Sequence, residues 1–292
     1  MDASNITNII ISTINTMFSR IFSSIDNQTY SILDKFVFIN SNILNDKYVA
    51  KLLGFSSKDG ILIVANSLVF GFLLYYGFKL LFSHLGVTSV EKPSKFIFKL
   101  IVFGICMNFS FFLCDQIINL NSLISDSIRQ IGENFYHSPI TFSKLIQKLN
   151  SVISINGDSL DVFSLDGILK SFISFGILKL VIVYSIRYIL IKIFVLISPF
   201  AFLSLSTKAS SIFFRSWFKS FISLLLIQSF VSIVLLFIFS LNLSSNNLFA
   251  KFILIGSIFV LIKSNSYVRE MLGGINTDFS ANLNNFKNII NK

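Results

Sequence analysis

The feature that most constrains this chain is a series of apolar stretches, each about as long as a lipid bilayer is thick. A membrane-spanning helix needs about 20 predominantly apolar residues. Five stretches meet this requirement: 60–83, 96–120, 168–206, 220–241 and 248–266. Only 13% of the residues are charged, about half the share in soluble domains, which argues against a water-soluble enzyme. We therefore predict an all-α, polytopic helical membrane protein with about five transmembrane helices.

The stretch 168–206 is too long for a simple span. A helix of this length would extend about 58 Å at 1.5 Å per residue, nearly twice the thickness of the hydrocarbon core. It contains the charged residues Lys179, Arg187 and Lys192, and also Pro199. Because no turn signal interrupts its middle, we predict one long, tilted helix with a kink at Pro199 rather than two shorter pieces.

The first 59 residues have the pattern of amphipathic helices rather than of spans. In 4–25 the residues Ile, Met and Phe recur at three- and four-residue steps, and a weaker pattern follows in 30–53. Two interpretations fit: a packed helical pair, or an arm that docks on the membrane surface or on a partner. Few basic residues lie here, which argues against charge-driven binding to anionic lipid. We predict a packed pair.

Lysine and arginine are unevenly distributed among the predicted connections. The connection 84–95 with its flanks, the connection 207–219 and the C-terminal tail are basic, which places them in the cytoplasm by the positive-inside rule. We attribute the net charge of +10 to this excess rather than to a nucleic-acid surface. The predicted organisation is therefore extracytoplasmic N-terminal helices (1–59), two spans (60–120), an outside loop (121–171), three spans (172–266) and a cytoplasmic tail (267–292).

The 121–171 loop is the one sizeable extramembrane insertion that we predict between spans. Its segments 122–136 and 142–155 both have helical apolar spacing, and His137-Ser138-Pro139 breaks the pattern between them. The loop is too small for an enzyme domain, but its size suits a docking platform for a partner.

No recognisable catalytic or metal-binding pattern occurs in the sequence. It has no P-loop, no GxGxxG, no CxxC and no HExxH motif. His84 and His137 fall on opposite sides of the membrane in the predicted topology, which excludes a shared metal site. Cys106 and Cys114 lie too far apart along one helix to form a disulfide. We therefore predict that the protein is not an enzyme and uses no cofactor and no metal.

Polar residues within the predicted spans are the strongest functional candidates, because a charge near the bilayer centre costs about 2.5–3.5 kcal/mol. These candidates are Asp115, Lys179, Arg187, Lys192 and Gln228. Asp115 is the only acid inside a predicted span, so we expect it to pair with Arg187. Lys192 then either lines a water-filled or subunit-lined pore that favours a polyanion, or it snorkels or bonds a carbonyl. Both interpretations of Lys192 remain open.

The predicted cytoplasmic loop 207–219 combines basic and aromatic residues: Lys208, Arg215, Trp217 and Lys219. A lone tryptophan between basic residues at a membrane edge is typical of an interface anchor. The same interleaving is also found in proteins that stack single-stranded nucleic acid. We favour the anchor.

The order of these features resembles the TrbL family, which comprises polytopic inner-membrane subunits of bacterial type IV secretion and conjugation machines and includes the sixth protein of the VirB set. The resemblance rests on outside N-terminal helices, five spans and a long loop after the second span. It also rests on KIFVLISPFAFLSLSTKASSIFFRSWFKSFISLLLIQSF, residues 192–230. There an apolar helix ending in Ser198-Pro199-Phe200 meets a basic, Trp-containing loop and then a span that contains Gln228.

This resemblance implies a non-enzymatic channel or scaffold subunit in the bacterial inner membrane, with its N-terminus outside and its C-terminus in the cytoplasm. The subunits would form a homo-oligomeric ring around the base of a translocation channel or pilus, and separate ATPases would power the passage of DNA or protein. The 121–171 loop would meet other membrane and pilus-base subunits of the machine. The resemblance does not distinguish DNA from protein as the cargo.

The main alternative is a small-solute secondary transporter or permease subunit. Such transporters often contain internal repeats and paired helices that are broken by Gly or Pro. This sequence has no visible repeat and one Pro-containing span, which favours the secretion subunit.

Overall fold

The computed structural model describes residues 3–44, 51–52, 60–86, 91–152, 161–241 and 248–272. These residues form α-helices and short 3-10 helices, with no strand among them, which confirms the predicted all-α fold. In chain order the elements are α1 (Ala3–Val37), η1 (Ser41–Ile43), α3 (Ile61–His84), α4 (Pro93–Asn108), α5 (Ser110–Tyr136), α6 (Phe142–Val152), α7 (Leu165–Leu203), η2 (Ser204–Ser206), α8 (Ser211–Ser240) and α9 (Leu248–Leu272).

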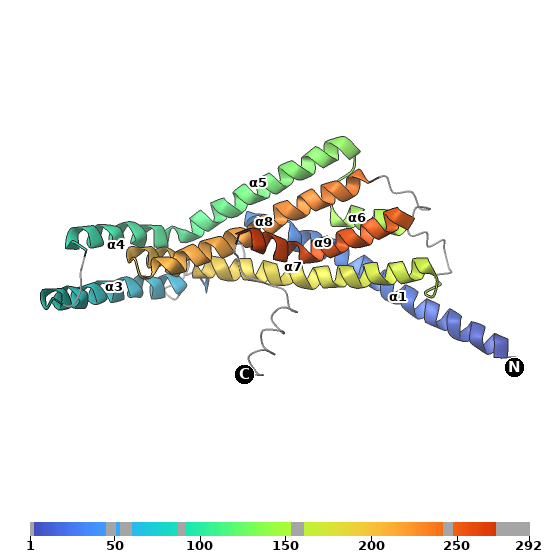
Figure 1. Cartoon of the computed structure of the whole chain (residues 1–292), viewed down its shortest axis with the longest axis horizontal. Helices are drawn as coiled ribbons and strands as arrows, with labels where there is room; N and C mark the ends of the chain where they lie inside the picture. Colours follow the sequence, from blue (N-terminus) through green and yellow to red (C-terminus); the bar gives the residue numbers. More distant parts are fainter. Residues whose placement is uncertain are drawn as a thin grey trace.

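The helices run roughly along one long axis, and α7 is the longest of them (Figure 1). Helix α7 packs against α1, α5, α8 and α9 in what we call the main bundle, and α6 packs against α1. Helices α3 and α4 form a separate hairpin at one end of the molecule, where they contact the end of α7 and η2 (Figure 1). The fold therefore has two regions of unequal size.

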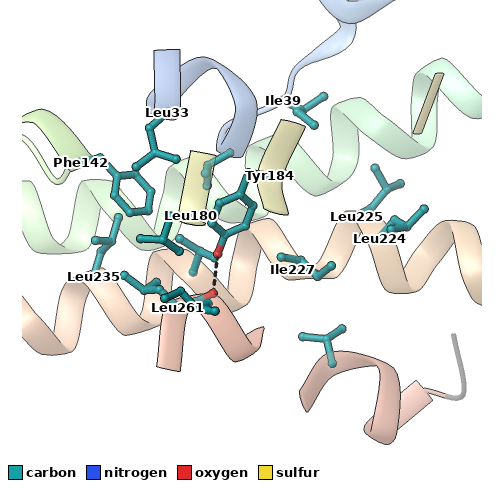
Figure 2. Close-up of a cluster of buried hydrophobic side chains, with 14 of the residues drawn as sticks. Leu33, Ile39, Phe142, Leu180, Tyr184, Leu224, Leu225, Ile227, Leu235 and Leu261 are labelled. Atoms are coloured by element: carbon teal, nitrogen blue, oxygen red, sulfur yellow. Dashed lines mark hydrogen bonds between the residues drawn. The ribbon is translucent and has the colours of Figure 1, made fainter. Parts of the chain in front are cut away.

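The main bundle has an extensive apolar core. Aliphatic side chains from α1, α7, α8 and α9 surround Tyr184 of α7 and Phe142 at the start of α6 (Figure 2). The labelled aliphatic members are Leu33, Ile39, Leu180, Leu224, Leu225, Ile227, Leu235 and Leu261. The Tyr184 hydroxyl donates a hydrogen bond of 3.0 Å to the Leu261 carbonyl, which ties α7 to α9.

The hairpin has a much smaller core of its own. Its buried residues are Ala65, Tyr76, Phe96, Leu100, Met107 and Leu203, the last of which belongs to α7. The Tyr76 and Phe96 rings stack with centroids 3.9 Å apart, and the Tyr76 hydroxyl donates to the Glu91 carbonyl at 2.7 Å. Most side chains of α3 point away from the rest of the protein.

Four helices are long and apolar enough to cross a membrane: α3, α7 with η2, α8 and α9. The chain is thus a multi-pass membrane protein by the length and composition of its described helices. The predicted span 96–120 falls on α4 and α5, which together are long and apolar enough to cross a membrane but meet at a 60° bend around Phe109. The described helices therefore offer four spans, or five if this bent pair crosses the membrane as one. The Asn108 side chain donates to the Gly104 carbonyl at 2.9 Å, and such local bonds compete with regular helix hydrogen bonding.

The predicted division between helices at 4–25 and 30–53 is wrong, because one helix, α1, covers the first segment and the start of the second. Packing differs sharply along it. Leu33 and Val37 are buried in the main bundle, whereas Ile9, Ile10 and Met17 are more than half exposed. The N-terminal half of α1 extends beyond the main bundle (Figure 1). Residues 45–50 and 53 of the predicted second segment lie outside the described residues.

The break predicted at His137-Ser138-Pro139 is confirmed. Helix α5 ends at Tyr136, His137 adopts the left-handed conformation with φ 50°, and α6 begins at Phe142. Asp34 of α1 caps this new helix, since its carboxylate accepts hydrogen bonds from the Phe142 N–H at 2.8 Å and the Ser143 hydroxyl at 3.0 Å. Residues 153–160 of the predicted outside loop lie outside the described residues.

The single long helix predicted for 168–206 is confirmed, with Pro199 inside it and buried. A kink at Pro199 stays a prediction. Ser164 caps the helix by accepting from the Gly167 N–H at 3.1 Å. In contrast, the predicted loop 207–219 is wrong from Ser211 onward. Helix α8 begins at Ser211, more than two turns before the uncharged stretch 220–241 in which we predicted the span.

Candidate functional site

The most unusual residue of the chain is Arg187, a charged side chain near the middle of α7 that is only 1% exposed. Its guanidinium donates to main-chain carbonyls from two other helices. Nε bonds the Leu224 carbonyl at 2.7 Å and Nη2 bonds the Leu225 carbonyl at 3.4 Å, both in α8. Nη1 bonds the Val37 carbonyl at 2.9 Å and the Phe36 carbonyl at 3.4 Å, both in α1.

The carbonyls of Phe36 and Val37 are available because α1 ends there. The last carbonyls of a helix have no partner within the helix, and they carry the negative end of the helix dipole. A guanidinium at this position donates hydrogen bonds to these carbonyls, and its positive charge interacts favourably with the negative end of the helix dipole. Arg187 therefore acts as a cap that binds the end of α1 inside the main bundle.

Gln228 of α8 holds the same helix end from another direction. It is fully buried, and its Oε1 accepts a hydrogen bond of 3.0 Å from the Ile39 N–H, two residues after α1 ends. Its Nε2 has no hydrogen-bond partner among the described residues. Arg187 and Gln228 together fasten the turn after α1 to α7 and α8.

The polar contacts continue from this point into α5. The Asn121 Nδ2 donates to the Leu225 carbonyl at 3.0 Å, one of the two α8 carbonyls that Arg187 also uses. Farther along, the hydroxyls of Ser125 and Ser232 lie 2.7 Å apart. We call Arg187, Gln228, Asn121, Ser125 and Ser232 the polar clamp, because their bonds join α1, α5, α7 and α8.

The predicted pair of Arg187 with Asp115 is wrong. Asp115 is half-buried in α5, and the guanidinium instead bonds the four carbonyls described above. The physical reason is the insertion of α1, whose end brings carbonyls without a partner in the helix to Arg187. Nothing in the local sequence around Arg187 or Asp115 indicates that insertion.

The two other charged candidates of α7 differ from Arg187. Lys179 is exposed, and Lys192 is half-buried with its ammonium 5.0 Å from the centroid of the Tyr188 ring, a cation–π contact. A pore role for Lys192 stays a prediction.

Two buried lysines were not among the sequence candidates. Lys170 is 2% exposed, and its Nζ donates to the Asn150 Oδ1 at 2.5 Å. Lys251 of α9 forms an ion pair of 2.6 Å with Asp166 in the first turn of α7. The signal that could have revealed the second pair is that Asp166 and Lys251 each lie at the start of an apolar stretch, and that alternate spans of a membrane protein begin on the same side.

Trp217 is neither an interface anchor nor a base-stacking platform. It is 4% exposed, and its Nε1 donates to the Phe194 carbonyl at 2.9 Å. The Phe221 ring stacks on it with centroids 5.4 Å apart. Because α8 already begins at Ser211, Trp217 lies on the face of α8 that packs against α7. The basic residues around it, Arg215 and Lys219, are exposed.

Lys208 belongs to a second polar cluster at the hairpin. Its Nζ lies 3.8 Å from Glu91 Oε1, and Lys99 bonds Glu91 Oε2 at 2.7 Å. The hydrogen bond from Lys99, together with the positive charges of Lys99, Lys208 and Lys95, lowers the pKa of the Glu91 carboxyl. The two basic connections predicted on one side of the membrane thus meet in space.

Comparison with known proteins adds no identification. No protein-family model, no curated protein and no solved structure matches the chain. The resemblance to the TrbL family therefore stays a prediction. Among the described residues, no group of three or more His, Cys, Asp or Glu side chains is placed to hold a metal ion. What the geometry supplies is a set of hydrogen bonds that fastens helices to one another.

Proposed function

We propose that this chain is a non-enzymatic scaffold or channel subunit of a type IV secretion or conjugation machine in the bacterial inner membrane. The observation that carries the proposal is the polar clamp. Arg187, the most deeply buried charged side chain of the described residues, donates hydrogen bonds to main-chain carbonyls of neighbouring helices. A buried charge used in this way serves the architecture of the subunit rather than the binding of a small solute.

The exposed apolar faces support assembly with other proteins. The N-terminal half of α1 extends away from the main bundle (Figure 1) and exposes Ile6, Ile9, Ile10, Met17 and Ile21. Such a helix, apolar along one side and rich in Ser, Thr and Asn elsewhere, suits contacts between subunits of a ring or with other components of the machine. The corner between α5 and α6 would serve as the second docking surface.

The orientation follows from the distribution of charge. The basic residues of the hairpin tip and of the η2–α8 connection would face the cytoplasm, and the α5–α6 corner would face outward. These two parts lie at opposite ends of the molecule (Figure 1).

The decisive experiment is isolation of the tagged full-length protein in mild detergent. We expect an oligomer that co-isolates with secretion-system membrane partners. Replacing Ile10 and Met17 together with Asn should abolish that co-isolation, because both side chains are more than half exposed on α1. Ser19→Asn, a polar change on an exposed position of the same helix, is the matched control. A monomer that binds a metabolite would contradict the proposal and favour a secondary transporter.

Orientation is tested by labelling single cysteines with a membrane-impermeant maleimide. In a background that lacks Cys106 and Cys114, His137→Cys should react in spheroplasts, whereas Ala209→Cys should react only after the membrane is opened. Both positions are exposed. Reaction of both, or the reverse pattern, would contradict the proposed topology.

A further inference from the structure

Two neighbouring hollows lie between α3 and the connection from η2 to α8. The first, of about 450 Å³, has an apolar wall that includes Leu68, Gly71 and Phe72. The second, of about 360 Å³, includes Lys79 and Lys208. Both are lined in addition by Tyr75, Thr207 and Ala209, so the apolar hollow continues into the basic one.

The second hollow has an excess of positive charge. Glu91 is the one acid in its lining, and that carboxylate is already bonded by Lys99 at 2.7 Å. Lys95 also acts on Glu91 through its charge. Around Lys79 and Lys208, the positive charges of the lysines therefore exceed the single negative charge of Glu91.

The two hollows are spaced as the two parts of a phospholipid would require. Leu68 in the apolar hollow and Lys79 in the basic one both belong to α3. Their separation along a helix is about 16 Å at 1.5 Å per residue, close to the half-thickness of a bilayer's hydrocarbon core, about 15 Å. The apolar-to-basic gradient of this groove therefore extends over about one leaflet.

We propose that the groove binds an anionic phospholipid. One acyl chain lies along Leu68, Gly71 and Phe72, and the phosphate of the headgroup lies against Lys79 and Lys208. Basic pockets between membrane helices on the cytoplasmic side recognise anionic headgroups in this way. Such a lipid would also fill the space between the hairpin and the start of α8, which few contacts within the chain cover.

The test measures how strongly the full-length protein retains phosphatidylglycerol relative to phosphatidylcholine. The protein is reconstituted in nanodiscs that contain both lipids, extracted gently, and its bound lipids are counted by native mass spectrometry. We expect phosphatidylglycerol to be enriched. Lys79→Gln and Lys208→Gln should each lower its relative association constant about fivefold, the contribution of one lysine near a membrane surface.

Two control variants distinguish specific binding of the lipid in the groove from nonspecific attraction to positive charge on the surface. Lys219→Gln removes an exposed lysine from the same end of α8 and should have a much smaller effect. Gly71→Leu should lower retention of the lipid, because a side chain there enters open space in the apolar hollow. Gly77→Leu, on the same helix and also facing open space, should leave retention unchanged. Thermal unfolding in detergent checks that each variant is folded, and Gly71→Ala replaces Gly71→Leu if the latter is not.

The proposal is overturned if Lys79→Gln and Lys208→Gln behave like Lys219→Gln, since the attraction would then be to the surface as a whole. It is equally overturned if soluble glycerol phosphate displaces phosphatidylglycerol at similar concentration, which would indicate a site for free phosphate. Because secretion partners are absent from this assay, its outcome is independent of the proposed function.

Discussion

The main bundle and the α3–α4 hairpin both contain helices that are apolar enough to cross a membrane, yet they are held together in different ways. In the spanning stretch of α8, 61% of the residues are buried within the chain, against 11% in α3. The main bundle contains the polar clamp and the Tyr184 bond to α9. The hairpin has a smaller core, and its polar contacts are fewer and centre on Glu91, which pairs with Lys99 and whose carbonyl accepts from Tyr76.

This contrast shows what apolarity does and does not determine in such a protein. Lipid tails are as apolar as Leu or Phe, so burial of apolar surface alone does not select one helix neighbour over another. Hydrogen bonds and close packing do, and in this chain they concentrate in the main bundle. The hairpin leaves most of its surface for lipid or other subunits.

The largest effect is expected for Arg187→Met, which keeps the volume of the side chain but removes its donors. The variant should lose about 2–3 kcal/mol of unfolding free energy, because the hydrogen bonds to the end of α1 and to α8 are lost. The measurement is reversible unfolding in mixed detergent. The matched control is Lys179→Met, an exposed lysine of the same helix, which should stay within about 0.5 kcal/mol of the parent.

If Arg187→Met and Lys179→Met were equally stable, the clamp would contribute nothing to the main bundle. Arg187→Lys adds a graded test. Its single ammonium cannot reach carbonyls of α1 and α8 at once with the same geometry, so its stability should fall between those of the parent and Arg187→Met.

Glycine substitutions should have opposite signs in the two regions. A Cβ on Gly176 of α7 would come within 2.8 Å of the Ile258 side chain of α9, whereas a Cβ on Gly77 of α3 would meet nothing within 4 Å. Gly176→Ala should therefore destabilise the protein by about 1–2 kcal/mol through overpacking. Gly77→Ala should stabilise it by about 0.5–1 kcal/mol, because Ala favours the helix. Equal effects in the same unfolding assay would show that both helices are equally packed.

Much of the fold could be predicted from the sequence because it depends on local patterns. Apolar runs locate α3, α7, α8 and α9, and the uninterrupted stretch around Arg187 indicates one long helix. The break at His137-Ser138-Pro139 follows from residue types that favour turns. Each of these features is decided within a short segment of chain.

The partners of the polar residues could not be predicted, because long-range packing selects them. Arg187 bonds Val37, which lies 150 positions away in the sequence, and pairing it with Asp115, the only acid inside a predicted span, was wrong. Trp217 was misassigned because the start of α8 was placed too late, which put a buried residue of the helix into a loop at the membrane edge. The bend at Phe109 has no Pro to indicate it.

A smaller effect is expected for Asp115→Leu. The carboxylate is half-buried in α5 and forms no ion pair with any residue that the structure describes. The variant should unfold within about 0.5 kcal/mol of the parent, and the double variant with Arg187→Met should be as unstable as Arg187→Met alone. A loss of stability by Asp115→Leu that vanishes in the Arg187→Met background would restore the ion pair that the sequence suggested.

The smallest effect is a dependence on pH that is confined to the hairpin. Since the Lys99 hydrogen bond lowers the pKa of Glu91, the stabilisation from this pair is present above the ordinary pKa of a glutamate and is lost as the pH falls through the lowered value. Amide hydrogen exchange reports this locally. On acidification, protection should fall in residues 92–99 while residues 224–232 of α8 keep theirs. Glu91→Gln should have low protection in residues 92–99 at every pH. A parent-like pH profile in Glu91→Gln would show that another group titrates, and an equal fall in α8 would remove the distinction between the two regions.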